Sequence, residues 1–171
     1  MSEMVFEIET VSAGATRRVG AALGDSVHSG DVIVLTGDLG AGKTVIAQGV
    51  AEALGISGGV TSPTFNILVV HRGPLELAHF DLYRLEHAWQ LEDIDFWGVV
   101  EGDSVSLIEW GDRFPGSLPS DVLTVTLTIT DDEERHITVS ASGVRSGRLA
   151  GEWRERCEGL DGVTLSRQEG S

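Results

Sequence analysis

Residues 32–44 read Val-Ile-Val-Leu-Thr-Gly-Asp-Leu-Gly-Ala-Gly-Lys-Thr and decide the fold of this chain. The apolar run at 32–36 does not alternate with polar residues, which is typical of a parallel strand buried on both faces. A glycine-rich turn follows directly. Residues 43–54 are good helix formers with apolar side chains on one face, and Gly55 stands where such a helix would end. The stretch therefore predicts a strand, a glycine loop and a helix, as in an α/β domain.

The loop at residues 37–44 matches the pattern G-x-x-x-x-G-K-[ST] of a phosphate-binding P-loop. Its glycines let backbone N–H groups converge on phosphate oxygens at the positive end of the following helix. Lys43, the single lysine among twelve basic residues, supplies a compact charge for the β- and γ-phosphates. The Thr44 hydroxyl suits a magnesium ion that bridges the same phosphates. The loop thus predicts a site for a nucleoside triphosphate with Mg²⁺.

Two acidic residues, Asp81 and Glu109, each end an apolar run with strand character. Because the carboxyl ends of strands face the ligand crevice in open α/β sheets, both are candidates to hold the magnesium shell or to orient the attacking water. The sequence does not divide these two tasks between them. Residues 61–65 are expected either to sense the γ-phosphate or to form an ordinary turn. We expect His79 to be a sheet residue rather than a catalyst, and Trp110 to be a core or rim aromatic.

Two hairpins are predicted outside this central unit. Residues 66–71 and 75–82 are strand-like segments on either side of a short turn. Residues 122–130 alternate strictly between apolar residues and threonine or other polar residues, and a second alternating segment at 137–141 follows an acidic turn.

We therefore predict an α/β fold with a single P-loop NTPase domain at residues 1–143. We expect a mixed, largely parallel central sheet and a C-terminal antiparallel hairpin. Glycine, serine and arginine dominate from residue 144 onward. We expect residues 144–171 to form a tail with at most a short helix, at 151–158, and otherwise loose order.

Composition narrows the function classes. The chain has 171 residues and a formal net charge of −15, which argues against a broad surface for nucleic-acid phosphates, DNA included. The lone Cys157 excludes an internal disulfide and a Cys-x-x-Cys pair. The first thirty residues show no basic segment before an apolar run, and the apolar runs are too short to span a bilayer. We expect a cytoplasmic protein without a membrane partner.

Missing motifs narrow the nucleotide chemistry. With one lysine, the chain has no [NT]-K-x-D guanine motif, and it has no L-S-G-G-Q stretch of transporter ATPases. Arg72, Arg84, Arg113 and Arg135 are scattered rather than gathered in a kinase-like lid. Without an obvious arginine finger, hydrolysis is expected to be slow until a partner contributes. A regulated ATPase is favoured, and a small-molecule kinase or a nucleotide-gated binding module without turnover are the alternatives.

Four segments together resemble the bacterial TsaE (YjeE) family of ATPases of tRNA threonylcarbamoyladenosine biosynthesis. They are the P-loop at 37–44, Ser-Pro-Thr-Phe at 62–65, His-Phe-Asp-Leu-Tyr-Arg at 79–84 and Ile-Glu-Trp at 108–110. The resemblance extends over residues 5–141. The family often has proline after the Glu-Trp pair, where this chain has Gly111.

The resemblance implies an ATPase that works with the TsaB and TsaD proteins on N6-threonylcarbamoylation of adenosine 37 in tRNA, with tRNA reached only through the complex. Lys43 and the loop amides would hold the phosphates of ATP. Thr44 and Glu109 would ligate Mg²⁺, and Asp81 would lie at the metal or the water. The residues expected at the nucleotide are Thr10, Asp38, Leu39, Gly40, Ala41, Gly42, Lys43 and Thr44, and those expected in catalysis are Lys43, Asp81 and Glu109.

Overall fold

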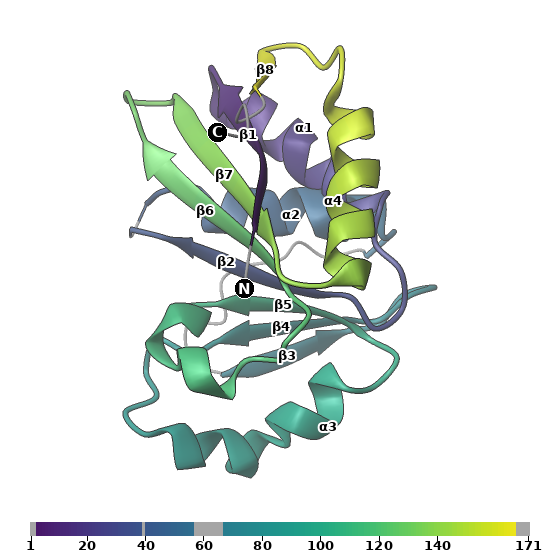
Figure 1. Ribbon diagram of the computed structural model, residues 1–171, viewed down its shortest axis with the longest axis vertical. Helices are drawn as coiled ribbons and strands as arrows, with labels where there is room; N and C mark the ends of the chain where they lie inside the picture. Colours follow the sequence, from purple (N-terminus) through teal and green to yellow (C-terminus); the bar gives the residue numbers. More distant parts are fainter. Residues whose placement is uncertain (1–2, 39, 57–66, 167–171) are drawn as a thin grey trace.

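The computed structural model describes residues 3–38, 40–56 and 67–166, which form one mixed sheet with helices on both faces (Figure 1). The order of strands across the sheet is β3-β4-β5-β2-β6-β7-β1-β8. The strands are β1 (Glu3–Thr10), β2 (Val32–Gly37), β3 (Leu68–His71), β4 (Leu77–Asp81), β5 (Val105–Glu109), β6 (Leu123–Ile129), β7 (Arg135–Ala141) and β8 (Val163–Ser166). The helices are α1 (Ala13–Gly24), α2 (Lys43–Ala53), α3 (Phe96–Val100) and α4 (Val144–Cys157), with 3-10 turns η1 (Ala88–Ile94), η2 (Gly111–Arg113) and η3 (Pro115–Ser117).

Parallel pairing is confined to the four central strands, β4, β5, β2 and β6. At one edge β3 pairs antiparallel with β4, and at the other β6, β7, β1 and β8 follow one another antiparallel. The predicted α/β fold with a mixed sheet is confirmed, and so are the two hairpins, β3–β4 and β6–β7. Among the described residues, four of the seven strand pairings are antiparallel, so the parallel part is the centre of the sheet and not most of it, as the expectation of a largely parallel sheet had it.

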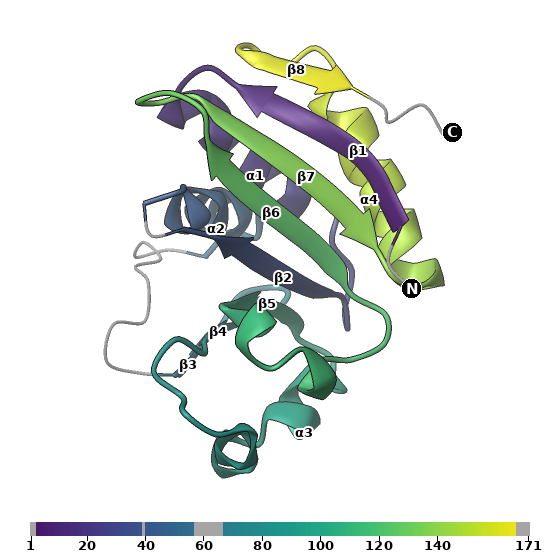
Figure 2. The same cartoon turned by 60° about the vertical axis from the view of Figure 1, so that its left-hand side comes forward.

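Each face of the sheet carries a hydrophobic core. In β2, Ile33 and Leu35 join the larger core, which α1, α2 and α4 cover. Val32 and Val34 join the smaller core, which includes residues of η1 and α3 on the opposite face (Figures 1 and 2). Because successive side chains of a strand point to opposite faces, a continuously apolar strand fits this doubly covered position. In β2 the polar side chain, Thr36, therefore comes only near the carboxyl end of the strand.

The C-terminal segment is more ordered than we expected. Residues 144–157 form α4, which is longer than the short helix expected at 151–158, and β8 adds a strand beside β1. Leu149, Trp153 and Cys157 are spaced four residues apart and all lie in the larger core. This helix has few apolar residues, but they lie on one face, and packing of that face against the core stabilises the helix. The low overall hydrophobicity of the segment hides the apolar face in the sequence.

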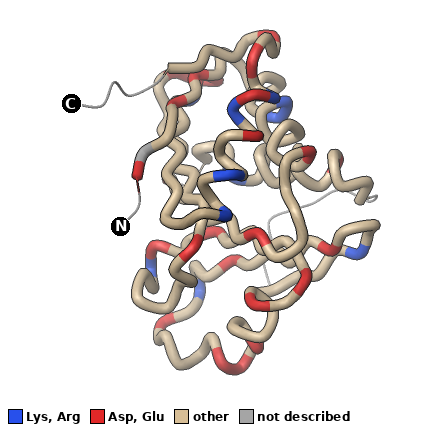
Figure 3. Tube along the Cα trace, turned by 45° about the vertical axis from the view of Figure 1, so that its right-hand side comes forward, with Lys and Arg blue, Asp and Glu red and all other residues tan. Residues whose placement is uncertain are grey.

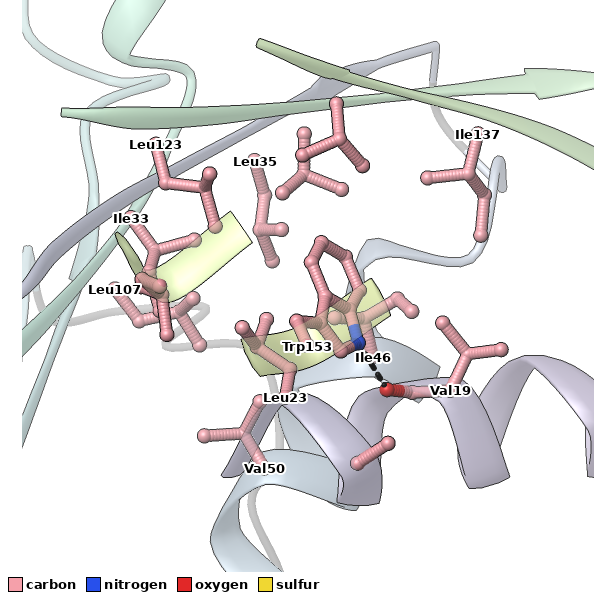
Figure 4. Close-up of a cluster of buried hydrophobic side chains, with 14 of the residues drawn as sticks. Val19, Leu23, Ile33, Leu35, Ile46, Val50, Leu107, Leu123, Ile137 and Trp153 are labelled. Atoms are coloured by element: carbon pink, nitrogen blue, oxygen red, sulfur yellow. Dashed lines mark hydrogen bonds between the residues drawn. The ribbon is translucent and has the colours of Figure 1, made fainter. Parts of the chain in front are cut away.

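Trp153 anchors α4 to the rest of the domain. Its side chain is fully buried, and its Nε1–H donates a hydrogen bond to the carbonyl oxygen of Val19 in α1 at 2.9 Å (Figure 4). Its ring also meets that of Phe6 in β1 edge to face, with centroids 5.7 Å apart. Burial of a large aromatic side chain with its polar atom paired is a strong stabilising contact.

No helix in the described ranges is long and apolar enough to cross a membrane.

The register of the parallel strands brings their carboxyl ends together. Asp81 of β4 lies opposite Glu109 of β5, and Glu109 lies opposite Leu35 of β2. Gly37, where β2 ends, lies opposite Leu127 of β6. The predicted acidic residues and the P-loop therefore lie together at the carboxyl ends of the parallel strands.

Candidate active site

The P-loop leaves β2 at Gly37 and enters α2 at Lys43. At Gly37 the backbone φ is 139°, and a Cβ there would lie 2.5 Å from the carbonyl oxygen of Leu127, so only glycine fits. Gly42 precedes α2 with φ 105°, in a region that side chains rarely adopt. The loop thus leads directly into the N-terminus of α2, the helix end that attracts anions.

Lys43 is buried within this loop, with 6% of its surface exposed. Its ammonium group donates to the carbonyl oxygens of Gly37 and, at 3.3 Å, of Asp38. Burial lowers the pKa of Lys43, and the nearby carboxylates of Glu109 and Asp81 act against that shift. The predicted cation and both predicted acids therefore lie within electrostatic reach of one another.

Glu109 is held by a partner that we did not predict. Its carboxylate is buried, and Oε2 lies 2.6 Å from Nε2 of His79, a fully buried residue of the adjacent strand β4. His79 lies opposite Leu107, two residues before Glu109, so both side chains project from the same face. His79 is a sheet residue as predicted, but it also orients a candidate catalytic acid.

Asp81 ends β4 beside Glu109 and remains partly exposed. Its Oδ1 accepts a hydrogen bond from the backbone N–H of Tyr83 at 3.1 Å. Such a bond to the backbone two residues on is typical of an aspartate that opens a turn. The carboxylate is thus oriented at the strand end by the residues that follow it.

The ring of Trp110 covers the ammonium group of Lys43, and Tyr83 packs against that ring. The Lys43 Nζ lies 4.0 Å from the centroid of the Trp110 ring, and the Tyr83 ring packs 5.0 Å from the same tryptophan. Trp110 has a positive φ of 62°, which is unusual for a bulky residue and directly follows Glu109. Arg113 donates to the carbonyl oxygen of Tyr83 and so ties the two segments together. Trp110, which was expected to be a core or rim aromatic, therefore lines the site next to Lys43.

Two charged residues of the site escaped the sequence analysis. Asp112 in η2 acts on Lys43 electrostatically, together with the other carboxylates. Arg135, counted above among scattered arginines, donates to the carbonyl oxygens of Ala41 at 3.0 Å and Gly40 at 3.3 Å. Asp112 could have been suspected from its place just after the Glu-Trp pair, whereas Arg135 reaches the loop only through the pairing of β7 with β6.

The remaining predicted residues occupy different positions around the loop. Thr44 lies partly buried in the first turn of α2, and Asp38 is exposed. Thr10 is buried, and its hydroxyl oxygen lies 2.7 Å from that of Thr16, whose methyl group would be 3.7 Å from a Cβ on Gly42. Thr10 thus reaches the loop through Thr16. Leu39 and the segment 61–65 lie outside the described residues.

The oxygen donors at this edge suit a magnesium ion shared with a bound phosphate. In the described part of the chain, no three His, Cys, Asp or Glu side chains are placed to hold a metal ion by themselves. Mg²⁺ commonly keeps several waters and takes one or two protein oxygens together with phosphate oxygens. The Thr44 hydroxyl and the carboxylates of Asp81 and Glu109 are donors of that kind.

Comparisons with known proteins agree with this arrangement. Residues 10–137 match the family described as Threonylcarbamoyl adenosine biosynthesis protein TsaE. A relative from Treponema pallidum is 43% identical over 129 residues, which are 75% of this chain and 96% of the relative. A relative from Bacillus subtilis is 38% identical over 144 residues, which are 84% and 90% of the two chains. Both bear the name tRNA threonylcarbamoyladenosine biosynthesis protein TsaE.

A solved structure shares the fold over almost the whole chain. The crystal structure of YdiB from Bacillus subtilis aligns with a TM-score of 0.74 at 32% identity. The alignment covers 91% of this chain and 97% of YdiB. The family predicted from four short motifs is thereby confirmed, and the chain belongs to the TsaE family.

Proposed function

We propose that this chain is a magnesium-dependent ATPase that serves N6-threonylcarbamoylation of adenosine 37 in tRNA together with TsaB and TsaD. Membership of the TsaE family supports the biosynthetic role. The observation that best supports ATPase activity is that Lys43 lies near the carboxylates of Asp81 and Glu109 beside the P-loop. Phosphoryl transfer needs this combination, because positioning and charge stabilisation do most of the work.

The residues divide the work around the triphosphate of ATP. The loop amides and the N-terminus of α2 bind phosphate oxygens, and Lys43 exchanges its bonds to Gly37 and Asp38 for bonds to the β- and γ-phosphates. A buried ammonium group interacts with phosphate more strongly than a hydrated one. Magnesium, when bound, neutralises charge that develops on the phosphates. Thr44 supplies it with an oxygen ligand.

Asp81 and Glu109 share the two remaining tasks, ligation of magnesium and orientation of the attacking water. Separate replacements, Asp81→Asn and Glu109→Gln, assign them. Loss of a magnesium ligand weakens magnesium-dependent nucleotide binding, whereas loss of the residue that orients water lowers kcat with little change in affinity. Calorimetric titration with MgADP and steady-state hydrolysis, measured for each variant beside Thr44→Ala, separate the two effects. Thr44→Ala is expected to follow the pattern of the magnesium ligand.

The hydrogen bonds of Arg135 support the proposal that a partner protein activates ATP hydrolysis. Arg135 lies at the P-loop, but its guanidinium donates to backbone carbonyls of the P-loop and of the β6–β7 turn, which keeps it from serving as an arginine finger. A group supplied or reordered by a partner raises the rate of such sites by orders of magnitude. Hydrolysis by the chain alone is therefore expected to be slow.

The charge of the chain favours an indirect relation to tRNA. The net charge is −15, and acidic residues lie on strands, helices and turns across the fold (Figure 3). This field repels a polyanion and attracts a basic protein surface. We therefore propose that tRNA is reached through the partner proteins, and that the work takes place in the cytoplasm.

Magnesium-dependent ATP hydrolysis tests the proposal. It is measured for the chain alone and with TsaB and TsaD of the same organism, with Lys43→Ala as the blank. The proposal predicts negligible turnover alone and a strong rise with both partners. No effect of the partners contradicts it. Stoichiometric appearance of a phosphorylated small molecule would instead indicate a kinase, and tight nucleotide binding without turnover in the complex would indicate a binding module.

A further inference from the structure

Arg135 links two loops that are almost a hundred residues apart in the sequence. It is the first residue of β7, and its guanidinium donates to five backbone carbonyl oxygens. Two belong to the P-loop, Ala41 at 3.0 Å from Nε and Gly40 at 3.3 Å from Nη2. Three belong to the β6–β7 turn at 131–134, at 2.8 to 3.1 Å from Nη1. The planar fork of arginine donors suits such a double attachment.

The bonds to the P-loop set the direction of its amides. In a trans peptide the C=O and the following N–H point in opposite directions. A carbonyl of Ala41 that points to Arg135 therefore turns the N–H of Gly42 away from it. The carbonyl of Gly40 does the same for the N–H of Ala41, which donates to the carbonyl of Asp38 at 3.0 Å. Arg135 also lies close to Gly42, since a Cβ there would be 3.8 Å from its Nε.

We propose that Arg135 is a positioning residue for the phosphates: it holds the Ala41 carbonyl outward so that the N–H of Gly42 is preorganised for an anion, and its bond to Gly40 supports the turn that the Ala41 N–H closes on Asp38. The inference rests on the proposed function, because it needs the P-loop to bind phosphate. Donors that are already oriented bind without a cost of reorganisation. Without Arg135 the peptide plane between Ala41 and Gly42 loses the bond that fixes its carbonyl, and a carbonyl turned inward repels phosphate.

Two substitutions separate this role from others. Arg135→Met removes the donors and keeps much of the side-chain stem. Arg135→Lys keeps the charge, but a single ammonium group cannot hold the P-loop and the hairpin turn together as a guanidinium does. Arg18→Met is the matched control, because the Arg18 guanidinium also donates to a backbone carbonyl, that of Asp161 at 2.9 and 3.3 Å, away from the P-loop.

Calorimetric titration with MgADP and thermal unfolding are measured on the full chain and its variants. We expect Arg135→Met to weaken MgADP binding about tenfold, the effect of roughly one net hydrogen bond, and Arg135→Lys to restore little of it. Arg18→Met is expected to lower only the unfolding temperature. A merely structural Arg135 would shift unfolding and leave the affinity of the folded chain unchanged.

Three results would overturn the inference. Unchanged MgADP affinity in Arg135→Met shows that the loop does not need the arginine. Full recovery in Arg135→Lys shows that charge alone acts, and this variant decides the question if Arg135→Met does not fold. A wild-type chain that binds no MgADP overturns the proposed function and this inference with it, so the two failures are distinguishable.

Discussion

The two halves of the sheet use their polar and aromatic residues in different ways. In the parallel half, β4, β5, β2 and β6 end beside the P-loop, where the ammonium group of Lys43 and the carboxylate of Glu109 are both buried. In the antiparallel half, which we define as β1, β8 and α4 and which leaves out β7 because its Arg135 contacts the P-loop, Trp153 is buried with its N–H paired to Val19. The first half buries the ammonium group of Lys43 beside carboxylates, whereas the second buries a large aromatic side chain whose neutral N–H is paired with a backbone carbonyl.

This difference indicates where function lies. Burial lowers the pKa of Lys43, which means that the folded state disfavours its charge, and Trp110 beside it adopts a left-handed backbone. Such costs persist where a ligand makes use of them. In the antiparallel half, the same kinds of residue stabilise the fold. Substitutions in the two halves should therefore separate activity from stability.

The largest expected effect is on stability, in Trp153→Ala. The substitution removes a fully buried ring and leaves the Val19 carbonyl without this donor, so the free energy of unfolding should fall by about 3–5 kcal/mol. Urea unfolding followed by circular dichroism measures it. Under conditions where the variant is folded, MgADP affinity should match the wild type. A loss of MgADP affinity in the folded variant would contradict the assignment of Trp153 to stability alone.

Lys43→Met is expected to show the opposite pattern. ATP hydrolysis in the presence of the partners should fall on the order of a hundredfold or more, because a charge that stabilises the transition state is lost. The free energy of unfolding should be unchanged or higher, since methionine keeps an apolar stem without a desolvated charge. Steady-state kinetics and urea unfolding on the same preparation test both statements. A strongly destabilised variant would contradict the functional reading of this half.

A smaller effect is expected at Asp121, which caps α4 from another part of the chain. Its carboxylate accepts from the backbone N–H groups of Ser146 at 2.9 Å and Arg145 at 3.0 Å. Although burial acts to raise it, hydrogen bonds from Ser146 and Arg145 hold the pKa of Asp121 below its ordinary value. Asp121→Ala should lower the free energy of unfolding at pH 7 by about 1 kcal/mol.

The pH dependence of that effect follows from its sign. A depressed pKa stabilises the fold at any pH above the ordinary value of 3.8, and this contribution is lost as the pH falls below it. The difference in unfolding free energy between Asp121→Asn and wild type should therefore narrow as the pH falls from about 5 through the ordinary value of 3.8. A difference that does not change with pH would show that the charge of Asp121 does not contribute to stability.

The smallest effect concerns Cys157 in the last turn of α4. The thiol is fully buried, and burial raises its pKa to about 12. Reaction with a thiol reagent at pH 8 should be slow in the native chain and fast in urea, which serves as its own control. Rapid reaction without urea would show that the end of α4 opens easily.

Local patterns predicted much of the parallel half. The P-loop and the two strand-end acids are short, contiguous signals, and the structure brings Lys43, Asp81 and Glu109 together as proposed. The pairing of His79 with Glu109 was missed because it depends on the register between two strands. Arg135 was missed because the hairpin carries it to a loop far away in the sequence.

The length of α4 was missed for a different reason. Its segment is rich in arginine and glycine, which conceals the spacing of Leu149, Trp153 and Cys157 along one face. These residues are buried by contacts with α1 and the sheet, and those contacts stabilise the helix more than its own composition does. Tertiary packing of this kind cannot be read from local propensity.

The central claim is that nucleotide binds at the carboxyl ends of the parallel strands. Amide chemical-shift mapping of the labelled chain during titration with MgADP tests it most directly. The account predicts saturable shifts concentrated at residues 40–46, 81–83 and 109–113, with little change in α4 and β8, and a clearly weaker response at the same MgADP concentrations in Lys43→Met. Shifts concentrated in the antiparallel half, or the same shifts in Lys43→Met, would contradict it.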